Sequence, residues 1–414
     1  MKYRDRKNKA LKLFDSSYGS YIPAFALIEI ENIIDFQNFE NNHDELKGTF
    51  IHEYCHYLQD VSTTYGFINF IYSLQELFLK LGMVINLHRK DLQYNRDIFG
   101  LLRGDDEIKN DIFYINKIEI KPHEFLQDYP EEEVKCVIVT YNGKLTFCFG
   151  SLCISESMAY LVEKRLYKIC ERESEFPYNV CEMICDKEYP EFAKNELFVL
   201  ALCEISLLER NAGIFFITAL RLMKKKNFLP QNILDMEKFL DKHFEVGFRG
   251  YRNQIDDILT DLYPGKNEEF VKVRQWIISR FELGCIYREQ SKMFISLSLS
   301  SENIQERYGR WQYIMNHFGC PIVIVKGRNV FEGGYLEGKS IDLRYMLGPW
   351  AIETAFAREG KSCPLKEICK MDQDKKYSSL CEERLKESKR LIFRYDRKNP
   401  RLLFSSRSTL TVHI

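Results

Sequence analysis

The spacing of apolar and polar residues predicts one strand and two helices near the start of the chain. The apolar run AFALIEI at 24–30 is typical of a strand. A polar segment then leads into a helical pattern from 45 to 61, and STTYG at 62–66 predicts a break before a second helix over 67–81.

A hairpin and a further helix are predicted next. Alternating apolar runs at 134–141 and 144–149 flank an Asn-Gly dipeptide, which is typical of a tight hairpin turn. Another alternating run at 112–120 predicts a strand before them, and a helical pattern over 155–171 follows. This order of strand, two helices, strands and helix predicts the α+β fold class.

The second half of the chain is predicted to be mainly helical. Helical patterns cover 191–225, 232–260, 267–283 and 301–317, and strand patterns cover 321–326 and 409–414. The sequence contains no internal repeat and no low-complexity linker that would mark a domain boundary.

Composition and charge exclude several functional classes. Of 414 residues, 45% are hydrophobic and 14% are aromatic, which is typical of a large packed interior and excludes a disordered chain. The 59 Lys and Arg nearly balance the 60 Asp and Glu. The resulting net charge of -1 gives no reason to expect nucleic acid or an anionic membrane as a partner.

Cysteine usage and apolar runs bear on the cellular compartment. The 13 cysteines are odd in number and scattered, unlike the disulfide framework of a secreted domain. The first residues contain no signal-peptide core, and no apolar run reaches the ~18–20 residues of a membrane span. We therefore expect a soluble protein of the reducing cytoplasm.

The segment with the clearest chemistry is His52-Glu53-Tyr54-Cys55-His56. In a helix, residues at i and i+4 project from one face, so His52 and His56 can both bind one Zn²⁺. Glu53 stands beside the first histidine, where its carboxylate can take a proton from a water molecule near the metal. The segment therefore predicts a zinc site with an adjacent general base.

The flanking residues resemble the extended signature of the zincin metallopeptidases. Thr49 stands where that signature favours Val or Thr, and Leu58 stands where it expects an apolar residue. The positions at which it excludes charge are uncharged here, namely Phe50, Tyr54, Cys55 and Tyr57. The resemblance implies a small sheet packed on the metal-binding helix and one Zn²⁺ per chain.

The resemblance also divides the chain into two predicted units. It covers about residues 20–225, which form the expected zincin-like metallopeptidase domain. The remaining residues, 226–414, are expected to form a mainly helical C-terminal lobe with a few strands. The strand predicted at 24–30 agrees with the resemblance, because the metal-binding helix of zincins packs beneath a sheet.

The third metal ligand lies outside the motif. The metzincin subclass would need Gly and His where this sequence has Gln59 and Ser62. The gluzincin subclass takes a Glu from a later helix, and the resemblance favours Glu156, because a small residue, Ala159, follows three positions later. Glu163 is on the same helical face and can support the site.

Other residues compete with Glu156 for this role. Glu76 follows the second histidine with nineteen residues between them, a spacing similar to that of thermolysin-like enzymes. It shares a polar stripe with Lys80, however, and such a Glu–Lys pair is typical of a solvated surface. Glu163 and His123 are further candidates.

Tyr160 departs from the thermolysin-like pattern, in which an Asp commonly orients a ligand histidine. Asp60, one turn after His56, can take that role instead. The oxyanion formed during peptide hydrolysis also needs a hydrogen-bond donor. The sequence offers four candidates for this donor, namely Tyr160, His123, Tyr65 and Tyr251.

Together these features predict a hydrolase, a zinc metalloprotease that cuts a protein or peptide substrate with Glu53 as general base. Its expected metal ligands are His52, His56 and Glu156. A regulatory protein or ligand is a further expected partner, because no inhibitory segment is visible in the sequence. The alternative is a catalytically silent zincin-fold protein that binds or regulates other proteins.

Three weaker patterns compete with this interpretation. Residues 333–340 have phosphate-loop spacing, but the strand before them is weak, so a Gly-rich turn is expected. Glu53 and His56 also satisfy the Glu-x-x-His pattern of di-iron bundles, which requires four long helices. Cys363, Cys369 and Cys381 are clustered in the sequence and would need a fourth ligand, such as Cys320 or His317, to form a structural zinc site. We expect free thiols at these three positions.

Overall fold

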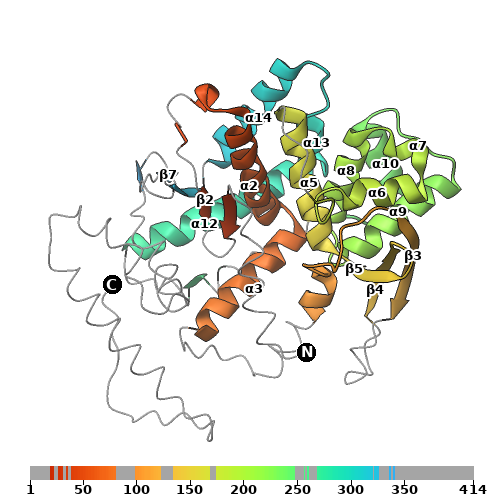
Figure 1. Ribbon diagram of the computed structural model, residues 1–414. Helices are drawn as coiled ribbons and strands as arrows, with labels where there is room; N and C mark the ends of the chain where they lie inside the picture. The colour runs from red at the N-terminus through yellow and green to blue at the C-terminus, as the bar shows by residue number, and fades with distance from the viewer. Residues whose placement is uncertain are drawn as a thin grey trace, which may run out of the picture.

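The structure, a computed structural model, has an α+β fold. Helices pack around a central pair formed by Asp44–Ser62 and Ser151–Leu166, and two small three-stranded sheets lie on either side of this pair (Figure 1). The residues that it describes are 19–22, 27–30, 34–35, 39–80, 98–122, 134–167, 174–247, 256, 259–260, 268–319, 321–325, 335–336 and 339–340. The α+β class agrees with the order of elements that the sequence predicts.

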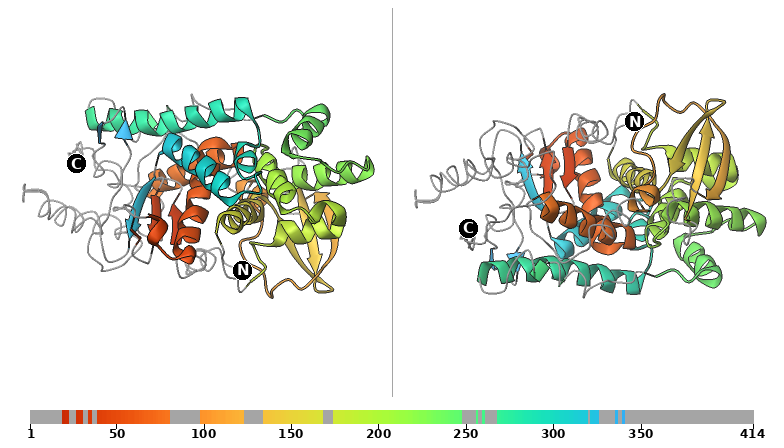
Figure 2. Two further views of the ribbon diagram at one scale, coloured as in Figure 1. Left: turned by 90° about the horizontal axis from the view of Figure 1, so that it is seen from above. Right: turned by 90° about the horizontal axis from the view of Figure 1, so that it is seen from below.

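One sheet lies beside the helix that carries the histidine pair. Its strands are β1 (Gly19–Ile22), β2 (Leu27–Ile30) and β6 (Ile322–Val325), in the order β1-β2-β6. β1 is antiparallel to β2, whereas β2 and β6 are parallel. The helix α2 (Asp44–Ser62) packs against β1 and β2 (Figure 2). The paired residues of β2 and β6 are Leu27 and Ile322, Ile28 and Val323, Glu29 and Ile324, and Ile30 and Val325.

The ends of α2 follow from its sequence. Asp44 and Glu45 in the first turn interact favourably with the positive end of the helix dipole. At the other end Thr63 is extended, and its hydroxyl donates to the Gln59 carbonyl at 2.8 Å. The next helix, α3 (Thr64–Lys80), starts at once, which confirms the predicted break and places it slightly earlier.

Two glycines allow other helices to approach the C-terminal end of α2. A Cβ on Gly66 in α3 would lie 2.2 Å from the Gln59 carbonyl oxygen. A Cβ on Gly284, in α12 (Glu268–Gln290), would lie 2.0 Å from the Val61 carbonyl oxygen. Only glycine permits such short approaches between backbones, so these two positions determine how closely α3 and α12 pack on α2.

The second sheet leads directly into the helix that faces α2. Its strands β3 (Ile115–Pro122), β4 (Lys135–Tyr141) and β5 (Leu145–Phe149) are antiparallel in that order. The predicted Asn-Gly turn joins β4 to β5, with φ of 46° and 90° at its two residues. The helix α5 (Ser151–Leu166) follows and packs along α2.

α5 begins at Ser151, earlier than the predicted start at residue 155. Gly150 before it is extended and packs tightly, because a Cβ there would lie 2.4 Å from the Leu102 carbonyl oxygen. The chain therefore turns into the helix directly after β5. As a result, Glu156 lies in the second turn of α5 rather than in the first.

The remaining elements surround these two helices and the two sheets. They are η2 (Phe39–Asn41), α6 (Val180–Glu188), α7 (Pro190–Ala193), α8 (Glu196–Ser206), α9 (Ala212–Lys225), α10 (Ile233–His243), α13 (Phe294–Ser298), α14 (Ile304–Phe318), β7 (Tyr335–Leu336) and β8 (Lys339–Ser340). The helical segment predicted over 191–225 comprises α7, α8 and α9. Asn195 and Asn211 separate them, because each side chain accepts a backbone N–H of the helix that it precedes.

The second half of the described chain agrees with the predicted pattern in part, because α10 ends at His243 within the helix predicted over 232–260, and α13 was not predicted. α12, α14 and β6 occupy the predicted segments, and α12 continues beyond its predicted end at residue 283. The strand predicted over 409–414 lies outside the described residues. Within the described ranges, every helix is too short or too polar to cross a membrane.

A buried ion pair holds the C-terminal end of α2. Arg288 on α12 and Glu204 on α8 lie 2.5 Å apart and are 4% and 0% exposed. The Arg288 Nε also donates to the Ser62 carbonyl at 2.8 Å. Glu204 in turn accepts the backbone N–H groups of Ile295 and Ser296. Because hydrogen bonds compensate both buried charges, the pair connects α8, α12 and α13 to α2.

One cluster of buried apolar residues includes parts of β2, α2, α5, α8, α14 and β6. The cluster therefore contains residues from before and after residue 225, the predicted domain boundary. The division into units over 20–225 and 226–414 stays a prediction. The packing around α2 uses elements from both units, since β6 and α12 come from the second.

Candidate metal centre

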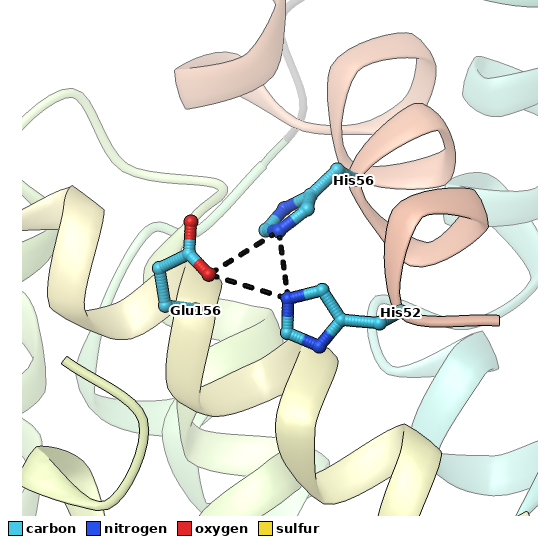
Figure 3. Close-up of side chains that lie close together, drawn as sticks. All are labelled: His52, His56 and Glu156. Atoms are coloured by element: carbon cyan, nitrogen blue, oxygen red, sulfur yellow. Dashed lines mark hydrogen bonds and ion pairs between the residues drawn. The ribbon is translucent and has the colours of Figure 1, made fainter. Parts of the chain in front are cut away.

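The structure brings the two histidines and Glu156 together between α2 and α5 (Figure 3). His52 Nε2 lies 3.3 Å from both His56 Nε2 and Glu156 Oε2. His56 Nε2 lies 3.5 Å from the same carboxylate oxygen. Among the described residues, these three form the only group of His, Cys, Asp or Glu side chains close enough to hold a metal ion together.

The three donor atoms fit a divalent transition metal such as Zn²⁺. They form a nearly equilateral triangle with sides of 3.3, 3.3 and 3.5 Å. A tetrahedron with such edges has its centre about 2.1 Å from each corner, the distance at which Zn²⁺ binds imidazole and carboxylate. Two imidazoles do not suit Mg²⁺ or Ca²⁺, which prefer oxygen, but other first-row metals accept the same donors.

The Glu156 carboxylate favours a positive charge on each histidine, whereas the charges of the two histidines oppose each other. Burial would lower the pKa of His56, but the Glu156 carboxylate outweighs it and raises this pKa to about 9. Burial also opposes a charge on His52, whose pKa is nevertheless raised by hydrogen bonds to Glu156 and Glu163. Burial would raise the pKa of Glu156, but the two histidines hold it well below its usual range. A metal ion bound here would replace the protons of the histidines.

Glu53 lies on α2 beside the donors and is not one of them. Its side chain is buried, and a Cβ on Gly19 of β1 would lie 3.3 Å from the Glu53 Cγ. Its charge adds to that of Glu156 in raising the pKa of His56. Glu53 is therefore a carboxylate close to the site, between α2 and the edge strand β1.

A second set of contacts orients the two imidazoles. His52 Nδ1 lies 3.2 Å from Glu163 Oε2, and His56 Nδ1 lies 2.9 Å from Gln59 Oε1. Glu163 occupies the helical face that the sequence indicates. Gln59 was not identified from the sequence as a partner of His56. Its position three residues after His56 on the same helix was the signal that could have indicated it.

Asp60 has a different environment from the one considered in the sequence analysis. Its Oδ1 accepts a hydrogen bond from Asn69 at 3.3 Å, and Tyr21 of β1 lies close enough to interact electrostatically with the carboxyl group. Burial raises the pKa of Asp60 to about 7. The carboxylate that contacts Nδ1 of His52 is that of Glu163 and not that of Asp60.

One tyrosine, Tyr178, packs on His52, and a second, Tyr160, packs on Tyr178. The Tyr178 ring centroid lies 5.9 Å from that of His52 and 6.0 Å from that of Tyr160. Ser157 holds the Tyr178 segment by donating to the Pro177 carbonyl at 3.1 Å. The sequence contained no signal for Tyr178, because its contact with His52 depends on how the segment between α5 and α6 folds back.

Other candidates from the sequence are not part of this cluster or cannot be placed. Tyr65 is buried on α3 and is not one of the three grouped donors. Glu76 is on α3, but its side chain lies outside the described residues. The oxyanion candidates His123 and Tyr251 lie outside the described residues as well.

The weaker motifs do not form a second site in the described chain. Lys339 and Ser340 form the strand β8, whereas the Lys-Ser pair of a phosphate loop opens a helix. The cysteine cluster and its possible partner Cys320 lie outside the described residues, and the members of the cluster are Cys363, Cys369 and Cys381.

Comparison with protein-family models, curated proteins and solved structures found no match to this chain. The function therefore has to be inferred from the geometry of the His52, His56 and Glu156 cluster. That cluster joins residues 104 positions apart in the sequence, so it is a product of the fold as well as of the local motif.

Proposed function

We propose that this protein is a zinc metallopeptidase of the gluzincin type. The observation that carries the proposal is the convergence of His52 Nε2, His56 Nε2 and Glu156 Oε2 within 3.5 Å of one another. Three protein donors leave the fourth position of a tetrahedral site for water or substrate. This arrangement is typical of catalytic zinc sites, whereas structural sites use four protein ligands.

The proposed chemistry divides between the metal and Glu53. A bound Zn²⁺ would polarise a substrate carbonyl and acidify a water molecule. Glu53 takes the proton of the attacking water and passes it to the leaving amine. Its place between α2 and β1 keeps this carboxylate beside the metal ligands. Tyr178, whose ring packs on His52, and its neighbour Tyr160 are the proposed donors to the oxyanion.

We also propose that the surroundings of the site are zincin-like. The sheet of β1, β2 and β6 packs on the helix that carries the histidine pair, and a second helix supplies the carboxylate. β6 comes from a segment about 300 residues after β2, so the proposed catalytic unit includes chain beyond residue 225. The proposed substrate is a protein or peptide in the cytoplasm, with activity limited by a regulatory protein or ligand.

Proteolysis by matched variants tests the proposal. Zinc-loaded wild type, Glu53→Gln and Glu45→Gln are incubated with a peptide library from a whole proteome, and new peptide termini are quantified by mass spectrometry. Glu53→Gln is expected to bind zinc normally and to cleave about 10²–10⁴ times more slowly, because it lacks the general base. Glu45→Gln, on the exposed first turn of α2, is expected to match wild type.

Equal cleavage by wild type and Glu53→Gln would contradict the assigned role of Glu53. If both proteins bind zinc and neither cleaves any peptide, the silent zincin-fold alternative becomes the better account. In that case a binding partner captured equally by wild type and Glu53→Gln would support a protein-binding role.

A further inference from the structure

Gln59 is a buried amide that contacts both helices of the proposed metal centre. It is 1% exposed and lies on α2, three residues after His56. Its Oε1 lies 2.9 Å from His56 Nδ1, and its Nε2 donates to the Ser155 carbonyl of α5 at 2.9 Å. Ser155 is the residue immediately before Glu156, so Gln59 connects one proposed ligand to the backbone beside another.

These contacts favour a hydrogen on Nδ1 of His56 when a cation, rather than a proton, lies between Nε2 and the Glu156 carboxylate. The Ser155 carbonyl can only accept a hydrogen bond, so the atom that faces it must be the amide nitrogen of Gln59. The amide oxygen then faces His56 Nδ1, and because this oxygen can only accept, Nδ1 must carry the hydrogen. The lone pair of neutral His56 is consequently on Nε2, the atom that points at Glu156 and His52.

The other histidine is oriented by a different group. His52 Nδ1 faces the Glu163 carboxylate at 3.2 Å, and a carboxylate also requires a hydrogen on that nitrogen. Both imidazoles therefore direct Nε2 to the same point. The orienting group of His52 comes from α5, whereas that of His56 comes from α2 itself and depends on α5 through Ser155.

We propose that Gln59 is a positioning residue that sets His56 as an Nε2 metal ligand and couples this ligand to α5. The inference rests on the proposed metal site. Groups that orient ligand histidines typically change metal affinity by about 10–100-fold when they are removed. Without Gln59, the His56 ring loses its Nδ1 partner and its link to α5 through Ser155, and among the described residues only its Nε2 contact with Glu156 joins it to that helix.

The test compares Gln59→Leu, which removes the acceptor, with Gln59→Glu, which keeps an acceptor for Nδ1 and loses the donor to Ser155. Tyr57→Phe is the matched control, because it removes a buried hydrogen bond of α2, that to the Phe318 carbonyl at 3.0 Å. Zinc affinity is measured by competition with a chelator. The visible spectrum of the Co²⁺-substituted protein reports the ligand geometry, and thermal unfolding of the metal-free proteins reports the fold.

Gln59→Leu is expected to bind zinc about 10–100 times more weakly than wild type, with an altered Co²⁺ spectrum. Gln59→Glu is expected to retain most of the affinity, and Tyr57→Phe to lower the melting temperature without changing the affinity. Wild-type zinc affinity in Gln59→Leu, or equal losses in Gln59→Glu and Gln59→Leu, would overturn the inference. Failure of the wild type itself to bind zinc or Co²⁺ would instead overturn the proposed function.

Discussion

At the residue scale, the proposed site places ionisable groups where their charges depend on one another. The Glu156 carboxylate lies within 3.5 Å of Nε2 of both His52 and His56. Because His52 is buried and the other two groups are partly buried, a charge on the carboxylate or on a histidine is costly alone and favourable beside the opposite charge. The same three groups are the proposed metal ligands, so binding of a cation competes with binding of protons.

The stability of the metal-free protein should fall as the pH rises from about 6.5 to about 9. The pKa of folded His56 is about 9, above the value of 6.5 of an ordinary histidine. The folded state therefore holds this proton more tightly than the unfolded state. The resulting stabilisation is fully present below pH 6.5 and is lost as the pH rises through 9.

Thermal unfolding of the metal-free protein across this pH range measures the effect. Glu156→Gln is the control, because it removes the carboxylate that raises the pKa of His56 and should flatten the dependence. The compared quantity is the melting temperature of wild type minus that of Glu156→Gln. If this difference stays constant or increases as the pH rises from 6.5 to about 9, His56 is not paired with Glu156 as described.

At the element scale, α2, the helix that carries His52 and His56, is held at its C-terminal end by close contacts with its neighbours. Gly66 brings α3 against the Gln59 carbonyl, and Gly284 brings α12 against the Val61 carbonyl. Arg288, one turn after Gly284, donates to the last residue of α2. The position of α2 relative to α5 therefore depends on helices from distant parts of the sequence.

Replacing Gly284 with alanine should destabilise the protein by about 1–3 kcal/mol, because the new Cβ would overlap the backbone of α2. Gly309→Ala on α14 is the matched control, since a Cβ there meets nothing within 4 Å. That change should be neutral or stabilise the helix by up to about 1 kcal/mol. Urea unfolding measures both free energies, and equal effects of the two substitutions would refute the described α2–α12 packing.

At the scale of the whole molecule, local sequence patterns located most elements but not how they meet. The helix predicted over 45–61 is present as α2, and the Asn-Gly turn joins β4 to β5, because both signals depend on neighbouring residues. The parallel pairing of β2 with β6 was not predictable in this way, since its partners are separated by almost the whole described chain.

The candidate site was also predictable only where its geometry depends on residues that are close in the sequence. The spacing of His52 and His56 was predictable because a helix places residues i and i+4 on one face. The place of Glu156 was inferred from a family resemblance, and the structure brings it to the histidines. The contacts of Gln59 and Tyr178 could not be predicted, because they require Ser155 or a folded loop to lie beside α2.

The central claim is that His52, His56 and Glu156 form one zinc site. Elemental analysis of zinc-reconstituted and dialysed wild type, Glu156→Gln and Glu76→Gln tests it most directly. We predict about one zinc per chain in wild type and in Glu76→Gln, and loss of most of this zinc in Glu156→Gln. Absence of zinc from correctly folded wild type, or full zinc content in Glu156→Gln, would contradict the account.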